Sequence, residues 1–450
     1  MLVGAFLRIY KLGEWSFWGD EMFTISGRED GFNYNVLRQS LSQTLIQAVT
    51  AVNGVNEWNA RIVPAMIGIL TIPILFFMVR TLFDTPTALL AAALLALSPW
   101  HLYWSQNARF YAALLLFYSL ALFFFYLGME HDKPSYLLLC VIFLGLAAKE
   151  RLLALFFVPV ILFYILLLYL LRFEKPRGWH SRNMAIFGLP LLIGGIFFAG
   201  PYVLNLPAWM SGFGFASNSP IWLAGSFAYY VGLPVMCLGC ASGLYLLMQK
   251  NRAGLLIGVN ALVPLLLLMT ISPFHYTANR YVFISLPSWL ILAAVASVTL
   301  FKNANGSLKL FTLGTLLVLL VHPINEDVLY YFFQNGNRDN WKDAFAYVEE
   351  HRVSSDLVAT SNLGLANYYL SGPSIILREI NFEQVEAGDQ RIWFVEDMTS
   401  SERFPKYHDW LTRNAQLVSI DDVPFQARIF TMRVYLFDPG VHTERARNEE

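Results

Sequence analysis

The sequence has few charged residues for its length. Only 14% of its 450 residues are Asp, Glu, Lys or Arg, whereas 56% are hydrophobic and 16% are aromatic. One soluble core cannot hold this much hydrophobic material, and so few charged side chains could not cover it. The composition therefore excludes a soluble globular protein and indicates a chain that crosses a membrane many times.

Cysteine is scarce as well. The three cysteines, Cys140, Cys237 and Cys240, all lie in hydrophobic runs. Cys237 and Cys240 have the two-residue separation of a redox or zinc pair, but within a helix in lipid we expect them to be small packing residues. No cysteine follows residue 325, which excludes a disulfide framework in the last part of the chain.

Long uncharged runs predict the architecture. An apolar run of about 18 residues or more crosses roughly 30 Å of hydrocarbon as a helix, and such runs recur over most of the chain. We predict a polytopic α-helical membrane protein with about 10–11 transmembrane helices. The predicted spans are 62–79, 88–104, 110–127, 136–148, 152–171, 184–202, 221–248, 254–271, 282–300 and 310–322.

Basic residues orient these spans. Ten Lys and Arg residues fall in alternate loops, which predicts that those loops face the cytoplasm. They lie at Arg80, at Lys133, and within 172–182, 250–252 and 302–309. The opposite, extracytoplasmic side then receives the segment around residue 20, the loops around residues 109, 149 and 280, and everything after residue 322.

The first ten residues, MLVGAFLRIY, amount to only half of a transmembrane helix. No cleavable signal-peptide pattern precedes them. We therefore expect a truncated first helix, or alternatively a short re-entrant or interfacial segment.

The composition changes at about Glu326. The residues from there on hold 21 Asp and Glu against 12 Lys and Arg, whereas the preceding 325 residues hold 11 against 19. Helix-like and strand-like stretches alternate in this tail, which predicts a small soluble α/β domain over 326–450 on the extracytoplasmic side. It has no Gly-rich phosphate loop or metal-ligand cluster, so we expect the chemistry to reside in residues 1–325.

Two adjacent carboxylates, Asp20 and Glu21, are the first candidates for that chemistry. The aromatic residues Trp15, Phe17 and Trp18 precede them, which is typical of a segment at the membrane interface. An acid pair there could meet a membrane-borne substrate while remaining solvated. The alternative is that both are ordinary solvated loop acids.

Isolated arginines are the second set of candidates. Arg109 is the only charged residue between Thr85 and Met129, and Arg280 is the only one between 253 and 301. A guanidinium near the bilayer is costly unless it faces water, pairs or snorkels to the interface. Its planar fork binds phosphate oxygens in a bidentate manner, so we expect a phosphate site.

Further polar residues accompany these arginines. Lys149 is a candidate for a second phosphate contact, and Glu150 could neutralise its basic neighbours. The run SPWHLYWSQNARFY surrounds Arg109 with polar side chains at the end of a hydrophobic hairpin. The candidates for substrate binding are His101, Tyr103, Gln106, Asn107, Tyr111, Arg151, His275 and Tyr276.

Three segments, FLRIYKLGEWSFWGDE, SPWHLYWSQNARFYA and NWKDAFAYVEE, resemble bacterial members of glycosyltransferase family 39 and their relatives. These are GT-C fold enzymes that use polyprenyl-phosphate sugars, and they include protein O-mannosyltransferases and the aminoarabinose transferase acting on lipid A. The resemblance extends roughly from Arg8 to Glu350.

The resemblance implies an inverting hexosyl or pentosyl transferase of the plasma membrane, with its catalytic GT-C domain in residues 1–325. Its partners would be a polyprenyl-phosphate sugar donor, a hydroxyl acceptor on a protein, lipid or cell-envelope glycan, and the lipid bilayer, with no nucleic acid. Asp20 would be the general base, and Arg109 would hold the donor phosphate. Glu21 could orient the partners of Asp20, bind the acceptor or help to hold a divalent cation. We favour a metal-free site without a cofactor, because hard cations want six or more oxygen ligands and only Glu57 is a further nearby acid.

The sequence departs from the pattern of this family in two places, and two other functions remain as alternatives to a glycosyltransferase. The His-Pro-Pro segment of many relatives is absent, and Asn107 stands where relatives often have Glu, which leaves acceptor recognition open. A lipid-linked-sugar flippase or transporter would also need many spans, although we find no internal repeat. The other rival is a non-catalytic family member whose tail scaffolds a partner.

Overall fold

The computed structural model describes residues 1–26, 28–29, 32–33, 39–204, 217–377, 380–425 and 428–440. The chain divides into two compact units. The helical unit comprises Met1–Tyr10, Tyr34–Ala48 and Arg61–Asp327. The α/β unit comprises Lys11–Asn33, Val49–Ala60 and Val328–Glu450, a grouping that no pattern in the sequence predicts.

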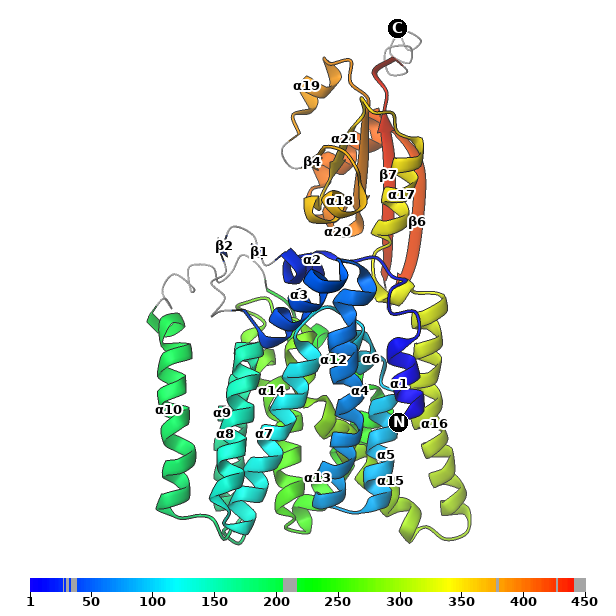
Figure 1. The fold of residues 1–450 in the computed structure, drawn as a ribbon. Helices are drawn as coiled ribbons and strands as arrows, with labels where there is room; N and C mark the ends of the chain where they lie inside the picture. The colour runs from blue at the N-terminus through cyan, green and yellow to red at the C-terminus, as the bar shows by residue number, and fades with distance from the viewer. Residues whose placement is uncertain are drawn as a thin grey trace. The chain divides into compact units, whose positions relative to one another are not determined.

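Long helices dominate the helical unit (Figure 1). The helices that lie wholly or mostly in it are α1 (Leu2–Ile9), α3 (Leu41–Asn53), α4 (Glu57–Leu82), α5 (Thr85–Ala96), α6 (Pro99–Ser105), α7 (Tyr111–His131), α8 (Pro134–Glu150), η2 (Leu152–Phe156), α9 (Phe157–Leu170), α10 (Ser181–Leu204), α12 (Pro220–Val231), α13 (Leu233–Met248), α14 (Arg252–Ile271), η3 (Asn279–Ser285), α15 (Leu286–Asn303) and α16 (Ser307–Phe332). Many of them pack on partners that are distant in the sequence, such as α13 on α15 and α9 on α14.

All ten predicted spans coincide with helices of this set. Among the described residues, six helices are long and apolar enough to cross a membrane, and up to eight if each of two bent pairs is one span. The other two predicted spans fall on α8, which has 17 residues, and on α10, in which the apolar stretch Ser181–Ile196 is shorter than 18 residues as far as its side chains are described. The polytopic helical architecture is therefore confirmed.

Local sequence explains both bends. The α5–α6 pair turns by 59° where Ser98 caps α6 and Pro99 opens it, because proline cannot continue the preceding helix. The α12–α13 pair turns by 97° at Gly232, which has a φ of +90°. A residue with a side chain rarely adopts that backbone conformation, so glycine permits the sharper bend.

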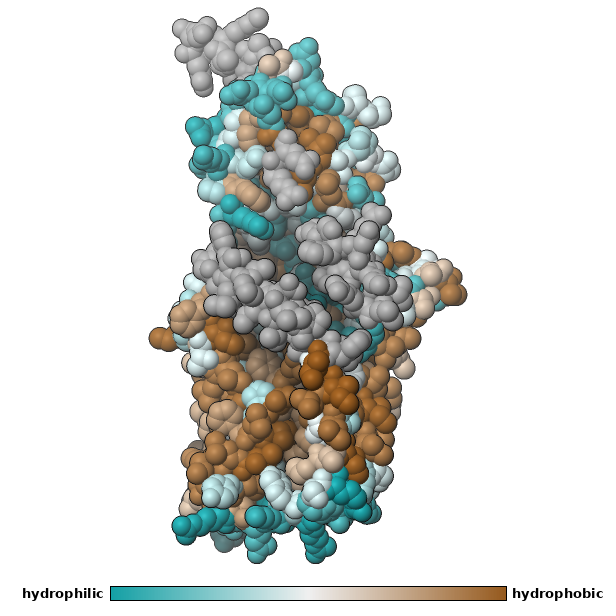
Figure 2. Space-filling view, turned by 90° about the vertical axis from the view of Figure 1, so that its left-hand side faces the viewer, coloured by the Kyte–Doolittle hydropathy of each residue, from teal (hydrophilic) through white to brown (hydrophobic). Residues whose placement is uncertain are grey.

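The loops predicted to be cytoplasmic gather at one end of the helical unit. Lys302 pairs with Asp84, and His180 lies 2.6 Å from a carboxylate oxygen of Asp132. Arg252 donates to Glu130 in the same region. On the face drawn in Figure 2, hydrophobic side chains predominate over the helical unit and hydrophilic ones lie at this end, as expected of an integral membrane protein.

A five-stranded sheet organises the α/β unit. Its order is β4-β3-β5-β7-β6, with β4, β3 and β5 parallel and the last two strands antiparallel to their neighbours. The strands are β3 (Leu357–Thr360), β4 (Ser374–Ile376), β5 (Ile392–Asp397), β6 (Gln416–Phe425) and β7 (Arg428–Phe437). The remaining elements are α2 (Gly19–Ser26), the short pair β1 (Arg28–Glu29) and β2 (Phe32–Asn33), η4 (Asn335–Asn337), α17 (Trp341–His351), α18 (Leu363–Tyr369), α19 (Phe382–Glu386), α20 (Met398–Arg403) and α21 (Pro405–Asn414).

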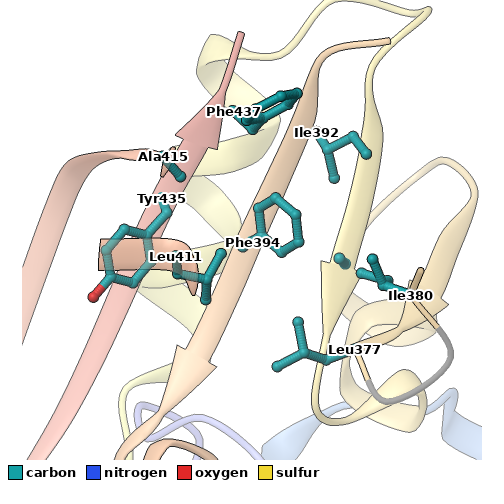
Figure 3. Packing of buried hydrophobic residues seen from close by; sticks show 9 residues of the cluster. Leu377, Ile380, Ile392, Phe394, Leu411, Ala415, Tyr435 and Phe437 are labelled. Atoms are coloured by element: carbon teal, nitrogen blue, oxygen red, sulfur yellow. The ribbon is translucent and has the colours of Figure 1, made fainter. Parts of the chain in front are cut away.

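Apolar side chains from several of these elements form the core on one face of the sheet (Figure 3). Ile392 and Phe394 point there from β5, and Leu411 and Ala415 cover them. All six residues of β5 are buried, because this strand lies in the middle of the sheet. The predicted α/β pattern of the tail is confirmed, and β6 is a strand that the sequence pattern missed. The strand-like stretches of the sequence are 357–360, 375–377, 392–395 and 427–437, and residue 427 lies outside the described residues.

Candidate active site

The acid pair opens helix α2 in the α/β unit. Asp20 and Glu21 occupy its first turn, where the helix dipole favours negative side chains. The backbone N–H of Glu21 donates to the carbonyl of Trp18 over 2.9 Å. Glu21 is completely buried, whereas Asp20 is half-buried and is the more accessible of the two carboxylates.

The segment before the pair is anchored in the same unit. The Ser16 hydroxyl donates to the carbonyl of Asp339 over 2.7 Å. The buried ring of Trp15 lies against Gly336, where an added Cβ would come within 2.7 Å of it. Gly336 also has a φ of +61°, so both its backbone and its neighbour favour glycine.

Arg109 lies in the tight connection between α6 and α7 of the helical unit. Its N–H donates to the carbonyl of Asn107 over 2.6 Å, and the side chain is only 8% exposed. Its Cζ atom lies 5.2 Å from the centre of the Phe110 ring. The Cζ atom of Arg151 lies 5.3 Å from the same centre. Two cations therefore share one aromatic ring, a contact that orients both guanidinium groups.

The predicted residues at the end of α8 have separate environments. Lys149 is half-buried and Arg151 is exposed. Glu150 is buried, and its carboxylate accepts the N–H of Ser42 over 3.1 and 3.3 Å. Burial raises the pKa of Glu150 to about 7, although its hydrogen bonds to Ser42 and Ser40 oppose that rise. Glu150 therefore caps the N-terminus of α3, a role that differs from the predicted neutralisation of its basic neighbours.

Arg280 is the second residue of η3, which packs on α7. Its guanidinium lies 5.9 Å from the ring of Tyr281, and the side chain is half-buried. The preceding loop carries His275, which is half-buried, and Tyr276, which is exposed. Asn218 holds this loop, since its amide donates to the carbonyl of Thr277 and accepts the N–H of Thr277, both over 2.9 Å.

Aromatic contacts bring the Arg109 hairpin and η3 together. The ring of Trp104 lies 3.9 Å from that of Tyr111 and 6.3 Å from that of Phe283. Tyr103 packs edge-on against Trp104 at 4.8 Å. The stretches around Arg109 and Arg280, far apart in the sequence, thus meet through a shared aromatic cluster.

His101 and Gln106 bond to α1. The Nε2 group of Gln106 donates to the carbonyls of Leu7, Arg8 and Tyr10 over 3.1, 3.3 and 2.8 Å. His101 accepts a hydrogen bond from Arg8. Both residues are completely buried, as is Asn107. The sequence pattern did not reveal the anchoring of α1 or the role of Phe110, because neither has a local signature.

No group of three or more His, Cys, Asp or Glu side chains that could hold a metal ion occurs within the described ranges.

Residues 41–194 match the model of the dolichyl-phosphate-mannose-protein mannosyltransferase family. A search of curated protein sequences found no significant match.

Several solved structures are similar over most of the chain. ArnT from Cupriavidus metallidurans in the apo state is 13% identical with a TM-score of 0.58, over 98% of this chain and 97% of that one. The same enzyme bound to undecaprenyl phosphate is 14% identical with a TM-score of 0.58, over 96% of each chain. The oligosaccharyltransferase AglB from Archaeoglobus fulgidus, in complex with an inhibitory peptide and a dolichol-phosphate, is 14% identical with a TM-score of 0.52, over 82% of this chain and 62% of that one.

These comparisons confirm the predicted fold and resemblance: the chain has the GT-C fold, and its residues 41–194 match the dolichyl-phosphate-mannose-protein mannosyltransferase family.

Proposed function

We propose that the protein is an inverting glycosyltransferase that moves a sugar from a polyprenyl-phosphate carrier to a hydroxyl acceptor. The observation that carries the proposal is the pair of guanidinium groups, Arg109 and Arg151, on the ring of Phe110. The similarity to structures bound to undecaprenyl phosphate and to dolichol-phosphate supports the class of donor. The sugar, either a hexose or a pentose, and the acceptor, on a protein, a lipid or an envelope glycan, are further parts of the proposal.

The donor phosphate is assigned to Arg109. When the glycosidic bond breaks, the carrier leaves as a phosphate anion and needs positive charge more than it needs a proton. A guanidinium donates two parallel hydrogen bonds to phosphate oxygens, and these charge-assisted bonds are strongest where water is excluded. Arg109 is the most buried of the candidate cations, and Arg151, Lys149 and Arg280 would supply further positive charge.

The proton is assigned to Asp20. The acceptor oxygen forms a bond to the anomeric carbon, the bond from that carbon to the phosphate oxygen breaks, and the hydroxyl proton passes to the carboxylate. One displacement inverts the configuration of the sugar. Asp20 is the more accessible acid, and buried Glu21 would orient it. The steps require no metal ion.

The proposed face is extracytoplasmic. The positive-inside rule assigns the basic loops, which gather around the Asp84–Lys302 and Asp132–His180 pairs, to the cytoplasm. The predicted topology then assigns the acid pair, the Arg109 connection and the residues after α16 to the opposite face of the plasma membrane.

Sugar transfer tests the proposal. A panel of radiolabelled polyprenyl-phosphate sugars would be incubated with an extracted membrane fraction that supplies the acceptor. Wild type, Asp20→Asn or Arg109→Lys would be added in equal folded amounts, and transfer of the label to the acceptor would be measured. Asp20→Asn should lower kcat by about 10²-fold or more, because the base is lost. Arg109→Lys should raise the donor KM about tenfold or more, because the charge remains but the planar fork is lost.

Arg80→Gln is the matched control. Arg80 is exposed in the last turn of α4, so this variant should leave transfer unchanged. Equal transfer by wild type and Asp20→Asn would refute the assigned base. Movement of lipid-linked sugar across the membrane without any transfer by wild type would instead favour a transporter.

A further inference from the structure

We infer that Tyr369, on helix α18 of the α/β unit, is a positioning residue for the acid pair. The inference rests on the proposed function, because it concerns the geometry of the proposed base. It makes the C-terminal part of the chain a component of the catalytic machinery, although that part carries none of the proposed catalytic groups.

The Tyr369 hydroxyl makes two hydrogen bonds in opposite senses. It accepts the backbone N–H of Phe17 over 2.8 Å. It also donates to Oε1 of Glu57 over 2.7 Å. A phenol hydroxyl can accept and donate at once, so one group joins the acid-bearing segment to the first turn of α4.

The bond to Phe17 bears directly on where α2 begins. The carbonyl of Trp18, the next residue, accepts the N–H groups of Glu21 and Met22 over 2.9 and 3.3 Å. The hydrogen bond to the Phe17 N–H therefore restricts the next residue, Trp18, whose carbonyl starts the first turn of α2. Asp20 lies within that turn, so a shift at Phe17 would move its carboxylate.

Other contacts of α18 restrict the same segment from the side. The ring of Phe17 packs edge-on against Tyr368 at 5.2 Å. An added Cβ on Gly19 would lie 2.9 Å from the Asn362 side chain. Asn362 in turn caps α18 by accepting the N–H of Leu365 over 3.2 Å. The residue immediately before Asp20 is thus in close contact with the start of α18.

Asn362 and its contact with Gly19 lie at the point where the strand order of the sheet reverses direction. Asn362 follows the carboxyl end of β3, and the chain continues from β3 to β4 on one side and then to β5 on the other. Such a switch point is where open α/β sheets usually bind their ligands. Here the residue at that position contacts the acid-bearing segment of the same chain.

Tyr369→Phe tests the inference in the full-length protein, since it deletes both hydrogen bonds and keeps the ring. Tyr368→Phe is the matched control. It deletes a neighbouring hydroxyl on the same helix, which donates to the carbonyl of Val55 over 3.3 Å, and it keeps the ring that packs on Phe17. A misplacement of about 1 Å in a reacting group can cost about 10²-fold in rate. We therefore expect Tyr369→Phe to lower kcat about tenfold or more with the donor KM unchanged, and Tyr368→Phe to resemble wild type.

Glu57 provides a conservative rescue. Glu57→Gln keeps an oxygen that accepts from Tyr369 and should retain most of the activity, whereas Glu57→Leu should lower kcat as Tyr369→Phe does. In the double variant Tyr369→Phe with Glu57→Leu, the losses should not add, because both remove the same link. Additive losses would overturn the inference.

Asp20→Asn separates this inference from the proposed function. Loss of transfer in Asp20→Asn, together with equal kcat in Tyr369→Phe and Tyr368→Phe, would overturn the inference and leave the proposed function standing. Hydrogen exchange at the Phe17 amide supplies a readout that does not depend on activity. Faster exchange in Tyr369→Phe than in Tyr368→Phe would support the positioning contact, and equal exchange would refute it.

Discussion

Arg8 donates a hydrogen bond from Nη2 to Nδ1 of His101 over 2.7 Å, and both side chains are completely buried. A guanidinium can only donate, so the His101 proton lies on Nε2. Arg8 also donates to the carbonyls of Leu95 and Ala96 over 3.0 and 2.8 Å, where α5 ends and the chain bends into α6. Through the Arg8 side chain, α1 therefore supplies hydrogen-bond donors to two backbone carbonyls at the C-terminal end of α5.

Arg8→Lys should destabilise the protein by about 1–3 kcal/mol, because a single ammonium cannot reach all the acceptors of the planar fork. Thermal unfolding in detergent would show a lower Tm. Arg80→Lys, at an exposed position, is the control and should leave the Tm unchanged. Equal Tm values for the two variants would contradict the capping role of Arg8.

Gln106→Leu should also destabilise the protein by about 1–3 kcal/mol, since it leaves backbone carbonyls at the end of α1 without their donor. The folded fraction should keep the donor KM of wild type. A raised KM with normal stability would instead support the substrate-binding role expected from the sequence. Gln249→Leu, in an exposed position at the end of α13, controls for the change of residue type.

Two glycine substitutions should have different effects on stability. An added Cβ on Gly68 would lie 2.1 Å from Oγ and 2.7 Å from Cβ of Ser105, so Gly68→Ala should force α4 and α6 apart and cost about 1–3 kcal/mol. Gly145→Ala in α8 meets nothing within 4 Å and should be neutral or stabilising by up to about 1 kcal/mol, because alanine favours a helix. Unfolding in detergent would compare them, and Gly68→Ala combined with Ser105→Gly should recover part of the loss. A stable Gly68→Ala variant would refute the close contact.

Glu150 predicts a pH dependence of stability. Burial raises its pKa from 4.5 to about 7, so the folded protein binds this proton more tightly than the unfolded chain does. The stability from this group is therefore fully present below pH 4.5 and is lost as the pH rises to about 7. The difference between the two values corresponds to about 3 kcal/mol at most.

Glu150→Gln keeps an oxygen that accepts from Ser42 and removes the titration. The free energy of unfolding of wild type should fall relative to that of the variant between pH 5 and 7. Parallel pH profiles for the two proteins would show that Glu150 does not titrate in this range.

Much of the fold could be predicted, because the hydrophobic pattern of a short segment is enough to indicate a membrane span or a strand. The uncharged runs predicted every described span, and the alternating pattern after Glu326 predicted most strands of the sheet. The proline and glycine residues at Pro99 and Gly232 lie at the bends, although the sequence alone did not predict their angles.

The environments of the candidate residues could not be predicted, because they depend on contacts between distant parts of the chain. Glu150 bonds to Ser42, 108 residues away, and Tyr369 bonds to Phe17 and Glu57 across more than 300 residues. Nothing in a local pattern states which donor will meet which acceptor.

Sequence alone determined that this protein is a multi-pass membrane protein with a small α/β region, because transfer of apolar side chains out of water depends on composition and periodicity. The tertiary structure decided that Arg109 and Arg151 share Phe110, that Gln106 holds α1, and that the acid pair belongs to the same compact unit as α18. Hydrogen bonds and cation–π contacts need partners within a few ångströms, and only the folded chain brings those partners together.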